Sequence, residues 1–326
     1  MNRYHLVHVT EFRYDGPVSE SYNEVRLRPI HDDRQSCLSF RLGITPAARP
    51  VAYRDGFDNW VHQFNLAVPH RYLRVEGESV VLVHDPEPMP AGSSSLAELD
   101  AQAEALMEDH YDFLAPTEYV PHLPKLRELV LASQQAADQS AAGFVQAAAS
   151  LIHKQFEYVK GATHVNSSIE DSLRLGKGVC QDFAHLLLGV IRMRGVPGRY
   201  VSGYLVPPSA VEGKQEGKQS VEEVVGGHAS HAWVEAYLPL AGWIAVDPTL
   251  GKPVEQRHIR VAFGRDYGDV APVRGVYRGE AGQRLSVDVR VRPALDVDGH
   301  EQLAESASGP FEPEQTELPQ QRAQQQ

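Results

Sequence analysis

GKGVCQDFAHLLLGVIRMRG, residues 176–195, places one of the chain's two cysteines directly after a glycine-bracketed turn. Apolar residues after Cys180 cover nearly every side of a helical projection, and Gly195 suits a helix end. We therefore predict a deeply buried helix that begins at Cys180. The partial positive charge at a helix N-terminus lowers the pKa of a thiol, so Cys180 is a candidate nucleophile. A lone cysteine on an apolar helix is more often a packed core residue, and the rest of the chain has to decide between the two roles.

Two strand-like segments after this helix carry polar residues that suit a nucleophilic thiol. HAWVEAYL, residues 231–238, alternates with a period of two and begins with His231. GWIAVD, residues 242–247, ends in Asp247 just before a proline, which by itself is only a turn signal. If the two strands are neighbours, the carboxylate of Asp247 meets the imidazole of His231 at one end of the sheet. A cysteine, a histidine and an aspartate so placed form a nucleophile, a base and a group that orients the base.

Two other histidines compete with His231 for the role of base. His185 follows Cys180 on the same helix, roughly 140° around the axis from the sulfur, so we expect it to be a packed or capping residue. His228 follows two glycines in a loop, whereas His231 begins a strand whose backbone holds it rigidly. Because a general base needs a fixed geometry before it needs a suitable pKa, we prefer His231.

A metallohydrolase is a further alternative that the sequence favours less. HASH, residues 228–231, offers two histidines and a serine, but it lacks the spacing of an HExxH motif and its glutamate. Cys37 and Cys180 lie far apart with no CxxC spacing, which indicates neither a disulfide framework nor a cysteine-rich zinc site. We expect no metal and no cofactor.

Composition limits the classes of partner and compartment. The chain has 326 residues and a net charge of −12, and no basic stripe suggests a nucleic acid as a partner. Two segments hold much of the acidity: residues 91–112 contain six acids and no Lys or Arg, and residues 301–326 contain five acids and one Arg. No run approaches the roughly 18 apolar residues of a membrane span, and the first residues lack the apolar run of a secretion signal. We therefore expect a cytoplasmic protein that binds no membrane.

Local patterning divides the chain into four parts. Short alternating runs separated by Gly, Pro and Asp predict an antiparallel β-domain over 1–90. Leucines at helical spacing in an acidic stretch predict a helical connector over 91–135. Helices followed by strands predict a catalytic core over 136–295, of which 283–293 is one more strand, and the Gln/Glu/Pro-rich residues 296–326 are expected to be disordered. The fold class that we expect is α+β, with helices packed on an antiparallel sheet in the core.

Several segments resemble signatures of one known family. GVCQDFAHL, GRYVSGYL, HAWVEAYL and GWIAVDPT are similar, in this order, to successive segments of the transglutaminase-like superfamily. YNEVRLRP, DNWVHQFNL, VPHRYLRV and HIRVAFGRDYGDVAPVRGVY resemble the bacterial subgroup that has an N-terminal β-domain. The likeness covers roughly residues 3–292. It implies a papain-related core in which Cys180 is the nucleophile, His231 the base and Asp247 the orienting acid.

The resemblance implies acyl transfer on a carboxamide of a protein or peptide. In such a reaction Cys180 forms a thioester, which an amine resolves in transglutamination and water resolves in amide or peptide hydrolysis. A non-catalytic binding module of the same fold is the remaining alternative, although all three triad residues are present. We expect Trp233 and Tyr237, which share a strand face with His231, to wall a dry channel for the incoming amine, unless both simply pack the core.

This sequence also departs from the animal transglutaminases. None of its tryptophans stands where those enzymes have one for the oxyanion, so we expect the backbone N–H of Cys180 to be one donor and leave the second unassigned. No calcium-loop pattern is present, and a calcium requirement is not expected. The loop 208–227 is long for this subgroup and precedes His231, so we expect it to shape or cover the cleft.

Overall fold

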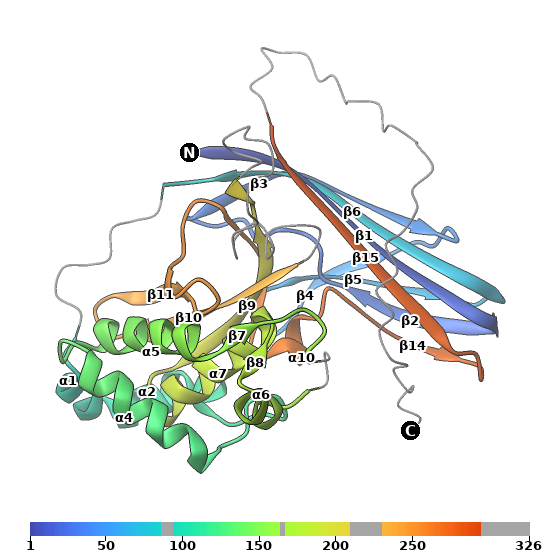
Figure 1. Ribbon diagram of the computed structural model, residues 1–326. Coiled ribbons are helices and arrows are strands. Elements are labelled where there is room, and N and C mark those ends of the chain that lie inside the picture. Colours follow the sequence, from blue (N-terminus) through green and yellow to red (C-terminus); the bar gives the residue numbers. More distant parts are fainter. Residues whose placement is uncertain (86–93, 164–166, 209–229, 295–326) are drawn as a thin grey trace.

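The computed structural model describes residues 1–85, 94–163, 167–208 and 230–294. A pair of β-sheets and a core of helices on a third sheet lie side by side (Figure 1), which confirms the predicted α+β class. Beyond its first residue, the loop expected to cover the cleft lies outside the described residues, as does the tail 296–326.

Two four-stranded antiparallel sheets pack face to face in the N-terminal region. One has the order β15–β1–β6–β3, with β15 (Gln283–Pro293), β1 (Asn2–Val18), β6 (His70–Val83) and β3 (Gln35–Thr45). The other has the order β14–β2–β5–β4, with β14 (Val273–Arg278), β2 (Glu20–Val25), β5 (Trp60–Leu66) and β4 (Val51–Arg54). Alternate side chains of the strands, together with Leu27 just after β2, meet in a small apolar core. Its strand residues are Tyr14, Val18, Val25, Phe64, Leu66, Leu73 and Val75.

The last two strands of the described chain complete these N-terminal sheets. β15 pairs with β1 from Tyr4 opposite Pro293 to Tyr14 opposite Gln283, and β14 pairs with β2. Figure 1 shows both in orange and red beside the blue strands. The range 136–295 expected for the core therefore includes two strands that belong to the other region. Alternation identifies a strand but not its neighbour, because the period of two is the same in every sheet.

Short helices connect the two regions. Ser95 caps the first of them, since its hydroxyl accepts the N–H of Glu98 while the Glu98 carboxylate accepts the N–H of Ser95. Leu99 and Leu106 are buried against the core. The elements are α1 (Leu96–Ala101), α2 (Ala103–Asp109), α3 (Tyr111–Leu114), the 3₁₀ turn η1 (Pro124–Leu126) and α4 (Arg127–Ala136).

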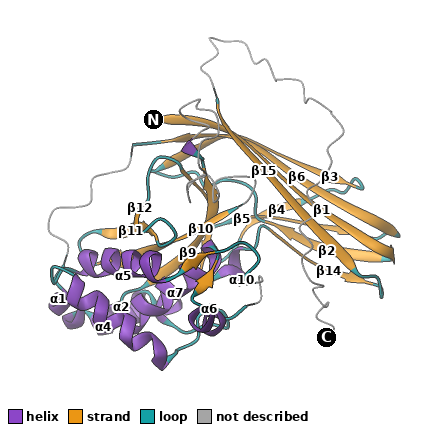
Figure 2. Cartoon of the chain, viewed as in Figure 1, coloured by secondary structure: helices purple, strands orange, loops and turns teal. Residues whose placement is uncertain are grey.

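The core is an antiparallel five-stranded sheet with helices on one face. Its order is β12–β11–β10–β9–β13, with β12 (Lys252–Pro253), β11 (Gly242–Asp247), β10 (His231–Leu238), β9 (Gly198–Leu205) and β13 (His258–Gly264). The helices gather on the side away from the N-terminal sheets (Figure 2). They are α5 (Ala141–Gln155), α6 (Ile169–Leu175) and α7 (Cys180–Met193). The short α10 (Tyr267–Val270) follows β13 and lies nearer those sheets.

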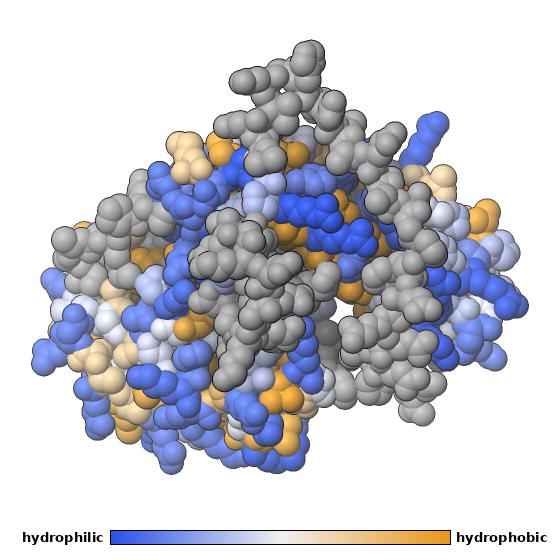
Figure 3. Space-filling view, turned by 45° about the horizontal axis from the view of Figure 1, so that its top comes forward, coloured by the Kyte–Doolittle hydropathy of each residue, from blue (hydrophilic) through white to orange (hydrophobic). Residues whose placement is uncertain are grey.

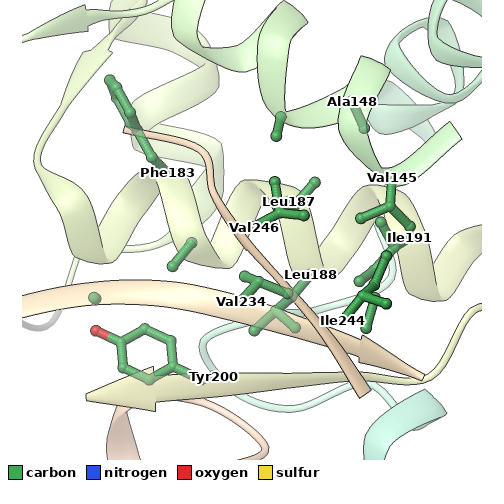
Figure 4. Packing of buried hydrophobic residues seen from close by; sticks show 14 of the residues in the cluster. Val145, Ala148, Phe183, Leu187, Leu188, Ile191, Tyr200, Val234, Ile244 and Val246 are labelled. Atoms are coloured by element: carbon green, nitrogen blue, oxygen red, sulfur yellow. The ribbon is translucent and has the colours of Figure 1, made fainter. Parts of the chain in front are cut away.

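Helix α7 is the predicted buried helix, and the structure confirms its start at Cys180. Leu187, Leu188 and Ile191 pack between α5 and the sheet residues of β10 and β11 (Figure 4). Gly195 follows the helix with a φ of 85°, a left-handed conformation that favours glycine. The apolar residues of this stretch therefore bury α7 on every side and fix the position of Cys180 at its N-terminus.

The start of α7 is held by a buried carboxylate. Asp182 accepts hydrogen bonds from the N–H of Val179 (2.8 Å) and from the hydroxyl of Thr163 (2.5 Å). The two-residue strand β8 (Lys177–Gly178) leads into the helix and pairs in parallel with β7 (Glu157–Tyr158). The turn before Cys180 is thus fixed from two sides.

Among the described residues, no helix has the length and apolar character needed to cross a membrane. Hydrophobic residues on the face drawn in Figure 3 appear as separate areas among hydrophilic ones. Most large apolar side chains of the described residues lie inside the protein, either in the core around α7 or in the core between the N-terminal sheets.

Candidate active site

His231 and Asp247 meet at one end of the core sheet. His231 is the first residue of β10 and Asp247 the last of β11, and the two strands pair antiparallel. This pairing brings Nε2 of His231 to 2.7 Å from Oδ2 of Asp247, with both side chains completely buried. The structure therefore joins the two residues at the sheet end where the sequence places them.

Cys180 stands beside this pair at the first position of α7, and its side chain is half-buried. Burial by itself lowers the pKa of His231, but the charge and hydrogen bond of Asp247, together with the Cys180 thiol, raise it to about 10. Asp247 binds Nε2, so Nδ1 is the ring nitrogen left for Cys180; no other described residue forms a hydrogen bond with it. This nitrogen is available to take the proton of the thiol.

Asp247 accepts four hydrogen bonds from residues that the structure describes. Oδ1 accepts the N–H groups of Thr249 (2.8 Å) and Leu250 (3.3 Å), and Oδ2 accepts His231 and His258. Burial disfavours the charged carboxylate, yet the histidines outweigh it and hold the pKa of Asp247 well below its usual range. The carboxylate is therefore ionised and fixed beside His231.

His258 is a buried neighbour of the triad that sequence reasoning missed. It is the first residue of β13, and its Nε2 lies 3.1 Å from Oδ2 of Asp247. The available signal was a histidine at the start of an apolar strand, the same pattern that identified His231. One ring nitrogen of each histidine and one carboxylate oxygen of Asp247 lie within 4.8 Å of one another, a spacing at which these three groups could also hold a metal ion.

Tyr158 is a second neighbour that the sequence did not single out. It lies on β7 opposite Gly178, two residues before Cys180. Burial raises the pKa of Tyr158, and the negative charges of Cys180 and Asp247 raise it further. Its ring stands perpendicular to that of Phe183 on α7, with 6.2 Å between the centroids. A neutral phenol therefore borders the thiol.

Trp233 lies beneath the histidines and not on the wall of a channel. Its side chain has no exposed surface, which contradicts the expectation that it faces an incoming amine. The indole centroid is 5.2 Å from the ring of His258 and 5.9 Å from the ring of His231. Trp233 therefore packs the two imidazoles from behind.

Tyr237 is not brought to the triad. It lies six residues along β10 from His231, which is about 20 Å in an extended strand. Its ring packs instead on His110 (4.0 Å between centroids) and Trp243 (5.4 Å). The period of two correctly places Tyr237 and His231 on one face, but it does not place them at the same end of the strand.

Comparisons with known proteins bear on this arrangement. Residues 4–82 match the family described as the bacterial transglutaminase-like N-terminal region, and residues 130–248 match the transglutaminase-like superfamily. An uncharacterized protein of Mycobacterium leprae is 38% identical over 293 residues, covering 89% of this chain and 99% of its own. An uncharacterized protein of Mycobacterium tuberculosis is 33% identical over 319 residues, covering 90% and 93%.

Two further similarities are more limited, one because it covers a shorter stretch of the chain and the other because the sequence identity is lower. A protein-glutamine gamma-glutamyltransferase of Pseudomonas aeruginosa is 31% identical over 102 residues, which is 30% of this chain and 14% of that protein. The crystal structure of a candidate cysteine protease from Cytophaga hutchinsonii has the same fold, with a TM-score of 0.65 and 20% identity over 91% of this chain and 92% of that one.

Proposed function

Because the chain belongs to the transglutaminase-like superfamily, we propose that it transfers the acyl group of a carboxamide in a protein or peptide to an amine. The Cys180 thiolate attacks the carboxamide carbon, and the tetrahedral intermediate expels ammonia, which takes a proton from the His231 imidazolium. A thioester on Cys180 remains. The amine then attacks this thioester, its proton passes to His231, and the new amide leaves as the thiolate is restored.

One observation carries the proposal. His231 is bound at Nε2 by the buried carboxylate of Asp247, which leaves its other ring nitrogen, Nδ1, for the thiol of Cys180. This arrangement gives the thiol a proton acceptor whose cation is stabilised. A high pKa of His231 favours the thiolate and imidazolium ion pair, which is the reactive form of a cysteine nucleophile.

The start of α7 supports stabilisation of the oxyanion. The first N–H groups of a helix have no carbonyl partner within the helix, and they point out of its N-terminus, where they can donate to a negative charge. Cys180 is the first residue of α7, so its own N–H is a donor for the negative oxygen of the tetrahedral intermediate.

The test uses glutamine-containing and asparagine-containing peptides, incubated with and without a labelled primary amine. Ammonia release and amine incorporation are followed together. We expect ammonia release and incorporation in the native protein and in Cys37→Ala, and neither in Cys180→Ala or His231→Ala.

The products of this experiment show whether an amine or water accepts the acyl group. Free acid as the sole product at every amine concentration would contradict the transferase and leave a cysteine amidase or peptidase, in which water resolves the thioester. If native protein releases no ammonia and carries no trapped thioester, the acyl-transfer proposal fails.

A further inference from the structure

The segment HIRVAFGRDYGDVAPVRGVY begins with a histidine that the triad itself does not require. His258 is completely buried at the start of β13, and its Nε2 lies 3.1 Å from Oδ2 of Asp247. The same oxygen accepts the Nε2–H of His231 at 2.7 Å. Two imidazoles therefore converge on one carboxylate oxygen.

The other ring nitrogen of His258 fixes where its proton is. An ionised carboxylate only accepts hydrogen bonds, so Nε2 of His258 carries a proton that it donates to Asp247. The backbone N–H of Glu255 donates to Nδ1 of His258 at 3.1 Å, and that nitrogen must be unprotonated to accept it. The carbonyl oxygen of Glu255 lies 3.2 Å from the same Nδ1. It could accept a hydrogen bond only if Nδ1 also carried a proton, which would make the ring a cation.

The surroundings favour the neutral ring. Burial lowers the pKa of His258, and the nearby positive charge of His231 adds to this effect. Asp247 and the carbonyl of Glu255 oppose it, but the pKa still lies below its ordinary value. Trp233 packs edge to face against the ring, with 5.2 Å between centroids, and confines it further.

We propose that His258 is a positioning residue of the triad, a neutral imidazole with its proton on Nε2 that holds Oδ2 of Asp247 where it accepts from His231. This inference rests on the proposed function, because it assumes that Cys180, His231 and Asp247 act together. With His258 in place, each oxygen of Asp247 receives two donors, which fills the acceptor positions of a carboxylate. A neutral donor achieves this without a second cation beside His231.

Nitrogen NMR of protein labelled with ¹⁵N-histidine tests the protonation directly. We expect Nδ1 of His258 to resonate as an unprotonated imidazole nitrogen at neutral pH and Nε2 as a protonated one, with the signals assigned by their loss in His258→Gln. A spectrum in which Nδ1 of His258 is protonated would overturn the proposal, because the ring would then be a cation.

The positioning role is tested by alkylation of Cys180 with iodoacetamide at neutral pH, which needs no knowledge of the substrate. Gln carries an amide N–H near the place of the imidazole Nε2, whereas Leu has no donor. We expect His258→Leu to slow alkylation about tenfold, the effect of one lost hydrogen bond to a charged group, and His258→Gln to recover most of the native rate. Equal rates in native protein and His258→Leu would overturn the proposal.

A third variant covers the case in which His258→Leu does not fold, as judged by circular dichroism and the melting temperature. The amide of Asn reaches only as far as Nδ1, so His258→Asn should be alkylated slowly while His258→Gln is alkylated rapidly. Equal rates in these two variants would also contradict the proposal.

Two controls separate this inference from others. If native Cys180 reacts no faster than a free cysteine, the proposed function fails, whatever His258 does. Zn²⁺ is titrated into native protein as well, because a metal needs unprotonated Nε2 on both histidines. Binding of one Zn²⁺ ion per chain that disappears in His258→Gln would overturn the positioning role.

Discussion

The guanidinium of Arg34, just before β3, donates a hydrogen bond to the carboxylate of Glu235 on β10, with 3.3 Å between Nη1 and Oε1. Glu235 is completely buried and also accepts hydrogen bonds from Arg199 of β9 (2.7 Å) and Arg260 of β13 (3.1 Å). The buried carboxylate of Glu235, with the partly exposed Arg34 on one side, therefore links the strand that carries His231 to the N-terminal region.

Replacing Glu235 by Gln leaves three arginines around a neutral amide in a buried site. Removal of one partner from a buried ion pair costs about 3–5 kcal/mol, so we expect the free energy of unfolding to fall by about that much. Urea denaturation at neutral pH measures it. Glu104→Gln, at an exposed position of α2, should change the same free energy by less than about 0.5 kcal/mol. Equal effects of the two substitutions would contradict a role for Glu235 in joining the regions.

The two cysteines should differ in reactivity. Burial raises the pKa of Cys37, so little of its thiol is ionised at neutral pH. Cys180 has a proton acceptor in His231 and should be alkylated faster. Peptide mass spectrometry after a brief iodoacetamide treatment measures both rates. Faster labelling of Cys37 would argue against an activated thiolate at Cys180.

Cys180→Ala should abolish turnover without unfolding the protein, because Ala is tolerated in a helix.

His231 should make stability depend on alkaline pH. Its pKa is about 10 in the folded protein against about 6.5 in an unfolded chain. Between these values the folded state holds a proton that the unfolded state has lost, so the contribution of His231 is complete below about pH 6.5 and declines as the pH rises toward 10. The measurement is the difference in unfolding free energy between native protein and His231→Gln across this range. If the difference in unfolding free energy between the two proteins did not change with pH, it would count against a charged His231 paired with Asp247.

Tyr237 should matter for stability and not for chemistry. Its ring belongs to an aromatic group with His110 and Trp243, about 20 Å along the strand from His231. We expect Tyr237→Ala to lower the free energy of unfolding by about 2 kcal/mol, since its half-buried ring leaves a partial cavity. The rate of Cys180 alkylation should stay at the native value. A slowed alkylation in folded Tyr237→Ala would place this residue in the site after all.

Local patterns predicted those features that depend on local geometry. The start of α7 at Cys180 follows from a turn and an apolar helix, and the meeting of His231 with Asp247 follows from two antiparallel neighbours. His258 was missed because it reaches Asp247 only through the order β10–β9–β13, which no periodicity encodes. Trp233 was misplaced for a related reason, since a shared face does not tell how deeply a side chain is buried.

The pairing of β15 with β1 has a consequence for how the protein is made. The ribosome releases β1 first and β15 last among the described strands, so one edge of β1 stays unpaired while the core is synthesised. An unpaired strand edge is a template for contact with other chains. Contacts between opposite ends of a sequence also form slowly, because a long loop must close before they contribute. Closure of the N-terminal sheets therefore has to wait until β15 has been synthesised, after every strand of the core sheet.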